Sequence, residues 1–325
     1  MSESTPGPTS GVQNFGPLDD ALSSAGLLEG VRVDHPIGAL TTYRVGGAAT
    51  RFVRPADIGE LERVAAAVAA AAREADVGTI PVLVLGRGSN LLVSDGGFAG
   101  LAVQLGPGFD EVVLEVEADG GTVRAGGGAS LPVVARRTVA GGLAGMEWAV
   151  GVPGSIGGAV RMNAGGHGSD MSTVLVSAST VDLGTGLSLT RSVDELSLGY
   201  RHSSVTGSEV VASVELRLPV GDRAEGEARL AEVVRWRRAN QPGGHNAGSV
   251  FINPPDDSAG RLIDAAGGRG LRLKTAEVST RHANFIQVDE GGSADDVVLL
   301  MAEVVRLVNK VHGVTLESET VLVGF

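Results

Sequence analysis

Residues 151–166 read GVPGSIGGAVRMNAGG, so six of these sixteen residues are glycine. Because glycine has no Cβ atom, such a segment can turn sharply and let its backbone come close to a ligand. Backbone N–H groups that converge from a loop of this kind bind the oxygens of a phosphate or diphosphate. The segment therefore indicates a binding loop, although a tight turn is the simpler reading of any such cluster taken alone.

A second glycine-rich segment lies earlier, where residues 86–92 read GRGSNLL directly after the apolar run IPVLVL. It is not a Rossmann turn, because Leu91 stands where the third glycine belongs and the following residues predict strands instead of a helix. Its glycines still let backbone N–H groups converge on a diphosphate, and Ser89 and Asn90 add side-chain donors. Two such loops, separated by several predicted strands, fit a ligand with a diphosphate and a long planar ring, which points to FAD.

The composition limits the class of protein. The 325 residues include 26 Lys and Arg against 38 Asp and Glu, a net charge of −12, which argues against a protein that coats nucleic acid or an anionic membrane. A hydrophobic share of 43% is enough to build buried cores. Cysteine is absent, which excludes disulfides and thiolate chemistry, and the 6 histidines never occur at close paired spacing, so no metal site is expected.

The start of the chain predicts a disordered tail over residues 1–15, because no basic segment leads into an apolar core as in a signal peptide. The longest apolar run, residues 64–72, is shorter than the roughly 18 residues that a membrane span requires. We therefore expect a cytoplasmic protein without a membrane span. An aromatic share of 3% leaves no obvious apolar patch and favours a monomer.

Hydrophobic periodicity predicts two folded parts, with a boundary close to residue 220, where the composition shifts. The first domain, 16–220, is expected to contain helices at 57–76 and 131–139 and strands at 80–85, 101–105, 112–117, 122–125, 174–183 and 210–218. The second domain, 221–325, alternates more clearly, with helices expected at 225–240, 258–266 and 294–312 and strands at 284–288 and 315–323.

Six short motifs occur in order across nearly the whole chain after the tail. They are TYRVGG (42–47), GRGSNLL (86–92), GVPGSIGGAVRMNAGG (151–166), YRHS (200–203), NAGSVFINP (246–254) and LESETVLVG (316–324). Each is weak evidence alone, but six in the right order make coincidence improbable. With this set the sequence resembles the UDP-N-acetylenolpyruvylglucosamine reductase family, also called UDP-N-acetylmuramate dehydrogenase.

The resemblance implies an α+β fold, with an FAD-binding unit of the vanillyl-alcohol oxidase type followed by a smaller α/β substrate-binding domain. It also implies that non-covalent FAD and the hydride donor NADPH serve to reduce UDP-N-acetylglucosamine enolpyruvate to UDP-N-acetylmuramate, a peptidoglycan precursor. Matched motif by motif, the residues expected to bind the cofactor are Gly86, Arg87, Gly88, Ser89, Asn90, Leu91, Gly151, Pro153, Gly154, Ser155, Gly157, Gly158 and Asn163, the last as a lining residue of the flavin pocket.

Hydride addition to the enol ether places negative charge beside the carboxylate, so the reaction needs a cation and a proton donor. By resemblance, Arg201 stabilises that carboxylate, Ser249 donates the proton and Glu319 works beside the arginine. From the residues alone, the plainer readings are a surface arginine, a capping serine and a solvated glutamate. Glu317 shares a face of the predicted strand with Glu319, so spacing does not choose between them, but the register of the family motif favours Glu319.

Further residues are placed around the substrate by the same resemblance. Those expected to hold the sugar diphosphate and the carboxylate are Tyr200, Gln241, Asn253 and His282. Arg237 and Arg238 either help with the diphosphate or are charges on a helix surface. The chain also departs from the family, since His167 stands where many members have tyrosine and Ile252 where lysine is common, which puts an aromatic contact and a phosphate contact in doubt.

Two other functions stay open from the sequence. One is a flavin-dependent alcohol oxidase on the same scaffold, in which His35 or His167 would have to tether the flavin because cysteine is absent. The other is a catalytically silent module that binds a nucleotide sugar. The joint presence of Arg201, Ser249 and Glu319 speaks against that loss of activity.

Overall fold

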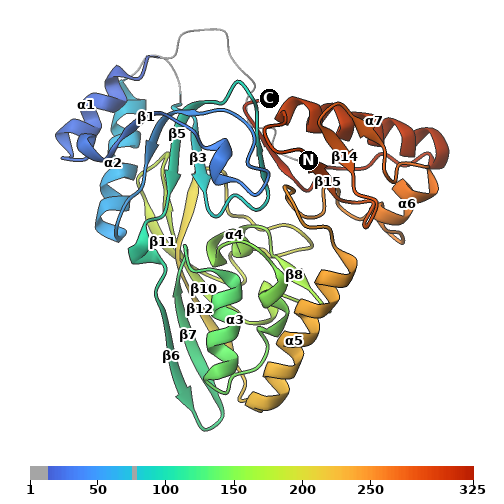
Figure 1. Ribbon diagram of the computed structural model, residues 1–325. Coiled ribbons are helices and arrows are strands. Elements are labelled where there is room, and N and C mark those ends of the chain that lie inside the picture. Colours follow the sequence, from blue (N-terminus) through green and yellow to red (C-terminus); the bar gives the residue numbers. More distant parts are fainter. Residues whose placement is uncertain (1–13, 75–78) are drawn as a thin grey trace.

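The N-terminal part of the chain forms a mixed four-stranded sheet in the computed structural model, which describes residues 14–74 and 79–325 (Figure 1). The strand order is β1 (Arg32–His35), β2 (Ala49–Val53), β5 (Phe98–Gln104) and β3 (Val82–Leu85). Strand β1 is antiparallel to β2, whereas β2 and β3 each pair in parallel with β5. Helices α1 (Gly16–Ser24) and α2 (Ile58–Glu74) pack beside this sheet, and α2 buries Leu61, Val64 and Val68 as its helical spacing predicts.

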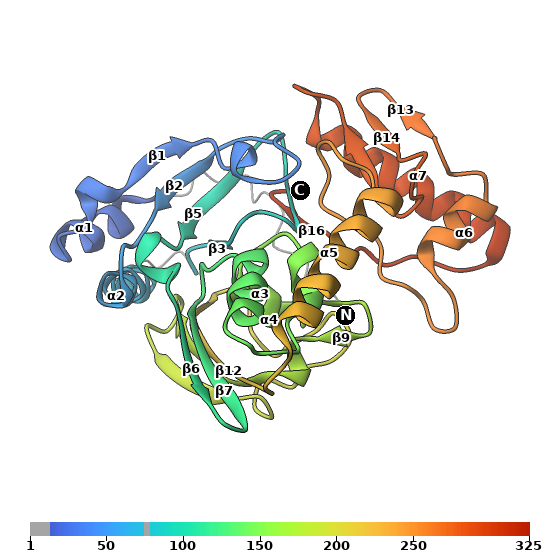
Figure 2. The same ribbon diagram turned by 60° about the horizontal axis from the view of Figure 1, so that its bottom comes forward.

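The middle of the chain forms a five-stranded antiparallel sheet. Its order is β11 (Ser188–Ser192), β10 (Leu175–Asp182), β12 (Glu209–Leu218), β7 (Gly120–Gly126) and β6 (Val112–Glu117). Helices α3 (Leu131–Ala140), α4 (Ile156–Arg161) and α5 (Arg223–Asn240) pack against it and share one apolar core with it (Figures 1 and 2). The predicted strands at 112–117, 122–125, 174–183 and 210–218 are confirmed within a few residues.

The C-terminal part is a small α/β unit. It contains α6 (Ala259–Ala265), β13 (Arg272–Leu273), β14 (Ala276–Val278), β15 (Ile286–Val288) and α7 (Ala294–His312). Helix α7 covers the three-stranded sheet, and their core also takes in Tyr43, Val45 and Leu92 from the N-terminal part. The chain then returns to the N-terminal part, where β16 (Val321–Val323) pairs in parallel with β4 (Leu91–Val93). Figure 2 shows β16 near the centre of the molecule.

The remaining elements are short. Strands β8 (Gly165–Gly166) and β9 (Ser169–Asp170) form a small hairpin, and single 3₁₀ turns occur at η1 (Leu28–Gly30), η2 (Gly38–Leu40), η3 (Pro107–Phe109), η4 (Glu147–Gly151) and η5 (Met171–Thr173). Among the residues that the structure describes, no helix is long and apolar enough to cross a bilayer. The expected α+β class is confirmed by this mixture of separate antiparallel and mixed sheets with packed helices.

One segment contains an element that was not predicted, and one local expectation is wrong. The glycine-rich segment contains the helix α4, which begins after Ser155 because the Ser155 hydroxyl caps it by accepting from the Gly158 N–H at 3.3 Å. The expected strand over 315–323 is a strand only at β16, since residues 315–320 form irregular backbone with a single bridge at Ser318. Glu317 and Glu319 therefore do not share a strand face, and Glu317 is exposed whereas Glu319 is half-buried.

The domain division stays a prediction. Helix α5 begins just after the expected boundary, with the Asp222 carboxylate as its cap, yet Val233 of α5 lies in the core of the preceding sheet. Of the expected tail, residues 1–13 lie outside the described residues. Phe15 packs beside the core of α1 and α2, and the Arg51 guanidinium lies 5.3 Å from the centre of its ring.

Candidate active site

A cavity of about 650 Å³ lies where the three parts of the chain meet. Both glycine-rich segments line it, and so do the end of α5, the loop before residue 250 and the segment before β16. This volume is in the range of small-molecule and cofactor sites. The wall combines the two glycine-rich loops with apolar side chains and six ionisable ones, which are Arg87, Arg161, His167, Arg201, Arg237 and Glu319.

The first glycine-rich loop connects β3 to β4. Gly88 has a φ of +62°, and a Cβ atom there would lie 2.6 Å from the carbonyl oxygen of Leu40. The Thr42 N–H donates to the Gly88 carbonyl at 3.0 Å, so the TYRVGG segment holds this loop. The loop conformation therefore requires glycine at position 88 for both space and dihedral angle.

The second loop, residues 152–155, faces the first loop across the cavity wall. A Cβ atom on Gly86 would lie 2.8 Å from the Ser155 hydroxyl oxygen, and one on Gly154 would lie 2.8 Å from the Ser89 hydroxyl oxygen. The two loops therefore approach each other closely only because these positions lack side chains. This arrangement forms a backbone cradle that a Cβ atom would fill, which fits the diphosphate expected of FAD.

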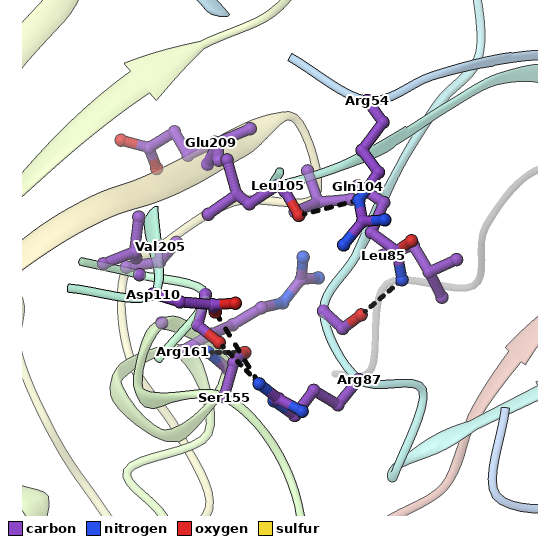
Figure 3. Close-up of a pocket in the computed structure, with 18 residues that line it drawn as sticks. Arg54, Leu85, Arg87, Gln104, Leu105, Asp110, Ser155, Arg161, Val205 and Glu209 are labelled. Atoms are coloured by element: carbon purple, nitrogen blue, oxygen red, sulfur yellow. Dashed lines mark hydrogen bonds and ion pairs between the residues drawn. The ribbon is translucent and has the colours of Figure 1, made fainter. Parts of the chain in front are cut away.

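A smaller cavity of about 250 Å³ adjoins the first and shares Gly86, Ser155 and Arg161 with it. Figure 3 shows the side chains of Arg54, Arg87 and Arg161 around it. Arg87 pairs with Asp110 at 3.6 Å on the rim, where both side chains are about half exposed. Asp110 and Glu209 also line this cavity, so its wall carries three arginines against two carboxylates, a small positive excess that suits an anionic ligand.

The parallel pairing of β16 with β4 brings the C-terminal segment to the first loop. The Asn90 side-chain amide donates to the Glu319 carbonyl at 3.0 Å, and the Val321 N–H donates to the Asn90 carbonyl at 3.0 Å. Because each strand begins at the same edge of this pair, the residues just before them lie side by side. Glu319 is thereby fixed next to the predicted cofactor loop.

Arg201 and Glu319 form an ion pair at the cavity, with 2.7 Å between Nε of Arg201 and Oε1 of Glu319. Their side chains are only 22% and 15% exposed. Burial raises the pKa of Glu319 above its ordinary value, and the positive charge of Arg201 opposes that rise without cancelling it. The Nε–H of Arg201 is buried and has no hydrogen-bond acceptor among the described residues, and Arg201 lines the cavity, so its guanidinium is placed to bind a carboxylate there.

Ser249 lines the same cavity, in a loop fixed by backbone pairing with the segment around Glu319. The Glu319 N–H donates to the Val250 carbonyl at 2.8 Å, and the Ile252 N–H donates to the Glu317 carbonyl at 2.9 Å. The buried Asn284 supports this pairing, because its side chain accepts from the Phe251 N–H at 3.0 Å and donates to the Phe251 carbonyl at 2.8 Å. The structure thus brings Arg201, Glu319 and Ser249 to one cavity.

Most of the predicted cofactor residues lie on the cavity walls. Those that line the larger cavity are Gly86, Arg87, Gly88, Ser89, Asn90, Leu91, Pro153, Gly154, Ser155 and Gly158. Gly157 lines the smaller cavity. Gly151 lines neither and instead packs under Arg237, whose Cδ atom would lie 2.4 Å from a Cβ at that position. Asn163 also lines neither cavity, in contrast to the expectation that it lines the flavin pocket.

The predicted substrate residues divide in a similar way. Gln241 lines the cavity and accepts a hydrogen bond from Arg237 Nε at 2.7 Å. Tyr200 is 60% exposed and Asn253 lies beside it, with the Asn253 amide donating to the Tyr200 hydroxyl at 3.3 Å. His282 packs edge-on against Phe285, which does line the cavity, with 4.8 Å between ring centres. Tyr200, Asn253 and His282 do not line the cavity themselves.

Some cavity residues were not predicted. Trp236, near the end of α5, lines the cavity and meets His167 edge-on at 5.1 Å between ring centres, and Phe285 lines another wall. Trp236 is a large aromatic residue among the charged residues of α5 and is 47% exposed, which is the kind of exposed apolar side chain that often marks a binding site. Arg237, left open as a surface charge, lines the cavity, and burial lowers its pKa.

The raised pKa of Glu319 predicts how stability depends on pH. A carboxyl group whose pKa is higher in the folded than in the unfolded state is protonated more readily when folded, so folding is disfavoured once it ionises. The free energy of unfolding of the wild type should therefore fall relative to that of Glu319→Gln as the pH rises above 4.5, the ordinary pKa of a glutamate. Above the raised pKa of Glu319 in the folded protein, the difference in unfolding free energy between the two proteins should become constant. Urea unfolding of both proteins from pH 4 to 8 measures this. A pH-independent difference, or one of opposite slope, would contradict it.

Two protein families match the chain. The FAD binding domain matches residues 49–190, which include both glycine-rich loops. The UDP-N-acetylenolpyruvoylglucosamine reductase C-terminal domain matches residues 240–323, which include Ser249 and Glu319. These matches confirm the expected order of an FAD-binding unit followed by a smaller unit, which the structure shows to be α/β.

Individual proteins match over almost the whole chain. A UDP-N-acetylenolpyruvoylglucosamine reductase 2 from Symbiobacterium thermophilum is 42% identical over 296 residues, which cover 90% of this chain and 92% of that protein. The Rubrobacter xylanophilus enzyme named UDP-N-acetylenolpyruvoylglucosamine reductase is 39% identical over 300 residues, covering 92% and 97%. The crystal structure of the Thermus caldophilus UDP-N-acetylenolpyruvylglucosamine reductase matches with a TM-score of 0.74 and 33% identity, covering 90% of this chain and 99% of that one. From these similarities, and from the site that both glycine loops share, it follows that the chain belongs to the UDP-N-acetylenolpyruvoylglucosamine reductase family.

Proposed function

We propose that this chain reduces UDP-N-acetylglucosamine enolpyruvate to UDP-N-acetylmuramate, with NADPH as the hydride donor. The observation that carries the proposal is the Arg201–Glu319 ion pair in the same cavity as Ser249 and both glycine-rich loops. FAD, bound non-covalently, supplies the hydride relay from NADPH to the substrate. The chain itself supplies binding, charge stabilisation and the proton.

The two glycine-rich loops are proposed to hold the FAD diphosphate. Support comes from the close approach of Gly86 to the Ser155 hydroxyl and of Gly154 to the Ser89 hydroxyl, which brings the two loops together at the cavity without a Cβ atom at either glycine. The adjoining cavity of about 250 Å³, with Arg54, Arg87 and Arg161 on its wall, then receives the nucleotide end of the cofactor. The larger cavity is left for the ring system and the substrate.

Arg201 is proposed to hold the substrate carboxylate as negative charge builds on the adjacent carbon. A guanidinium fork can bind both carboxylate oxygens, and in a half-buried site this charge stabilisation is stronger than in water. Glu319 holds the guanidinium by charge attraction, with Oε1 2.7 Å from Nε of Arg201, although the described contacts give the Nε–H no hydrogen-bond acceptor. Glu319 therefore orients the cation that stabilises the developing charge.

Ser249 is proposed to donate the proton that completes the reduction. Its loop pairs with the Glu319 segment, which keeps the hydroxyl on the cavity wall beside the Arg201–Glu319 pair. Gln241 is the substrate-binding residue that the cavity wall supports most directly. Tyr200, Asn253 and His282 would reach the substrate only at the mouth of the site or through Phe285.

The oxidase alternative requires a covalent tether. Of the two histidines that would have to serve, His167 lies on the cavity wall, whereas His35 stacks on Phe52 with 4.2 Å between ring centres. Acid precipitation of the purified protein separates the readings. All yellow colour should remain in solution, and colour in the pellet would favour the oxidase.

The presence of Arg201, Ser249 and Glu319 at one cavity argues against the other alternative, a catalytically silent module that binds a nucleotide sugar.

We further propose that the protein works as a monomer in the cytoplasm. The large exposed apolar side chains, such as Val33, Leu189, Trp236 and Val311, lie on separate elements instead of in one continuous patch. A self-association surface usually needs such a patch. Sedimentation at micromolar concentration should give a single species near the chain mass of 32.9 kDa.

A side chain at Gly88, in the first glycine-rich loop, is expected to weaken FAD binding. In Gly88→Ala the new Cβ would meet the Leu40 carbonyl at 2.6 Å with φ at +62°, so the loop must shift. Backbone strain of this kind costs about 1–3 kcal/mol, which corresponds to roughly a tenfold or larger loss of FAD affinity. Titration of the apoprotein with FAD, followed by flavin fluorescence, measures it. Gly30→Ala is the matched control because nothing lies within 4 Å of its Cβ, and equal affinities of the two variants would contradict the loop assignment.

A further inference from the structure

Asn163 directly follows the glycine-rich helix α4 and is buried, with only 3% of its surface exposed. Its side-chain amide donates to the Gly199 carbonyl at 2.9 Å and to an Asp170 carboxylate oxygen at 3.3 Å. Its side-chain oxygen accepts from the Ser172 N–H at 3.1 Å. The polar atoms of this side chain are thus engaged with protein groups and do not face either cavity.

Gly199 begins the tight turn that carries Arg201. The turn is closed by two backbone hydrogen bonds between Gly199 and His202, of 2.9 Å and 3.1 Å. Arg201 lies at its third position with a φ of +55°, a left-handed conformation that is unfavourable for a residue with a Cβ atom. Such a conformation persists only where surrounding contacts hold it. The direction of the Arg201 side chain therefore depends on what fixes this turn.

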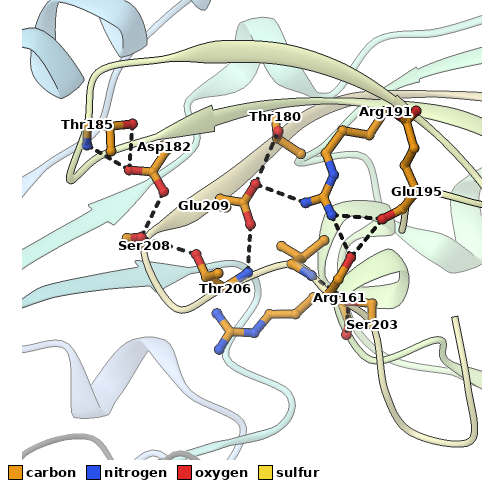
Figure 4. Close-up of polar contacts among 12 residues, drawn as sticks. Arg161, Thr180, Asp182, Thr185, Arg191, Glu195, Ser203, Thr206, Ser208 and Glu209 are labelled. Carbon is orange, nitrogen blue, oxygen red and sulfur yellow. Dashed lines mark hydrogen bonds and ion pairs between the residues drawn. The ribbon is translucent and has the colours of Figure 1, made fainter. Parts of the chain in front are cut away.

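The chain after the turn is held by other contacts. The Ser203 hydroxyl donates to the Arg161 carbonyl at 2.7 Å. Arg191 donates to the Ser204 hydroxyl at 2.5 Å and pairs with Glu209 at 3.0 Å, and Figure 4 shows the Arg191 side chain pointing toward Glu209. The segment before the turn is held at Gly199 by Asn163. The turn is thus anchored on both sides, and Asn163 supplies the anchor before it.

We propose that Asn163 is a positioning residue that fixes the Arg201 turn, so that the guanidinium meets Glu319 and a substrate carboxylate. The inference rests on the role of Arg201 in the proposed function. Without the Asn163 amide, the Gly199 carbonyl keeps only its bond to the His202 N–H, and the turn can relax toward a conformation without positive φ. Arg201 then moves away from Glu319 while the cofactor loops stay in place.

Asn163→Gly tests this, because glycine tolerates the φ of +38° at this position and only the side-chain bonds are lost. Substrate-driven flavin reoxidation should slow by about 10- to 100-fold, the usual effect of a misplaced catalytic group, whereas reduction by NADPH should be unchanged. Calorimetry adds an equilibrium readout. Binding of UDP-N-acetylmuramate should weaken, and binding of UDP-N-acetylglucosamine, which lacks the carboxylate, should not. Thr138→Val is the matched control, because it removes a buried hydroxyl bonded to the Ala135 carbonyl away from the site.

A double-mutant cycle with Arg201→Ala shows whether the two residues act together. The Asn163→Gly effect on reoxidation should vanish in the Arg201→Ala background. Two results would refute the positioning role while leaving the role of Arg201 intact. In the first, Arg201→Ala reoxidises the flavin slowly but Asn163→Gly reoxidises it at the wild-type rate. In the second, the losses of the two variants are additive in the double mutant. Should Arg201→Ala reoxidise normally, the role of Arg201 falls and the inference falls with it. If Asn163→Gly does not fold, Asn163→Asp, which keeps the size and the acceptor but loses the donor, should show the same split.

Discussion

Arg201→Lys is expected to slow substrate-dependent reoxidation of the flavin by on the order of 10²–10³, the usual cost of removing one charge-stabilising donor group. Nε of Arg201 lies 2.7 Å from Oε1 of Glu319 in an ion pair, and we expect the guanidinium fork to bind the substrate carboxylate. Lysine has a single ammonium on a flexible stem and cannot hold both partners in one plane. Reduction of the flavin by NADPH should keep its rate, because that step makes no carboxylate-adjacent charge.

Stopped-flow absorbance of the two half-reactions measures this split. Arg235→Lys is a matched control, because Arg235 is an exposed arginine of α5 that lines neither cavity. Normal reoxidation in Arg201→Lys would remove Arg201 from the reaction. Equal slowing of both half-reactions would indicate instead that the substitution disturbs the cavity as a whole.

Ser249→Ala should lower turnover by about 10² or more, which is the usual contribution of a positioned proton donor. The loop of Ser249 is fixed through the backbone of Val250 and Ile252 and through the Asn284 side chain, so removal of one hydroxyl should leave its course unchanged. The loss should therefore appear in kcat, with little change in substrate binding.

A solvent isotope effect adds a second readout, because loss of the proton donor should change the isotope dependence of reoxidation. Ser188→Ala on β11, whose hydroxyl contacts only Glu62 in an exposed pair, is the control. Wild-type turnover in Ser249→Ala would assign proton donation to another group or to water.

Local patterns predicted the elements that build the site. The period of α2 and α7, the apolar run of β3 and the breakers after α5 each depend on neighbouring residues, and each lies within a few positions of its expectation. Glycine content likewise located both binding loops, because a close backbone approach requires glycine wherever it occurs.

Contacts between distant segments were not predictable in this way. The pairing of β16 with β4 joins residues more than 200 positions apart and shortens the expected terminal strand, so the choice between Glu317 and Glu319 could not follow from alternation. The role of Asn163 has the same origin, because its partner Gly199 lies 36 residues away. Spacing within a motif predicts which nearby residues lie together, but it does not predict which distant segment their side chains contact.

The most direct test of the account is anaerobic. The purified yellow protein is reduced with NADPH, UDP-N-acetylglucosamine enolpyruvate is added, and flavin absorbance is followed near its visible maximum. The account predicts bleaching by NADPH and full recovery of colour only when the substrate is added, with recovery slowed by about 10² or more in Ser249→Ala and Arg201→Lys. Bleaching that the substrate fails to reverse in the wild type would contradict the account, because the cavity that joins Arg201, Glu319 and Ser249 to the cofactor loops would then serve another acceptor.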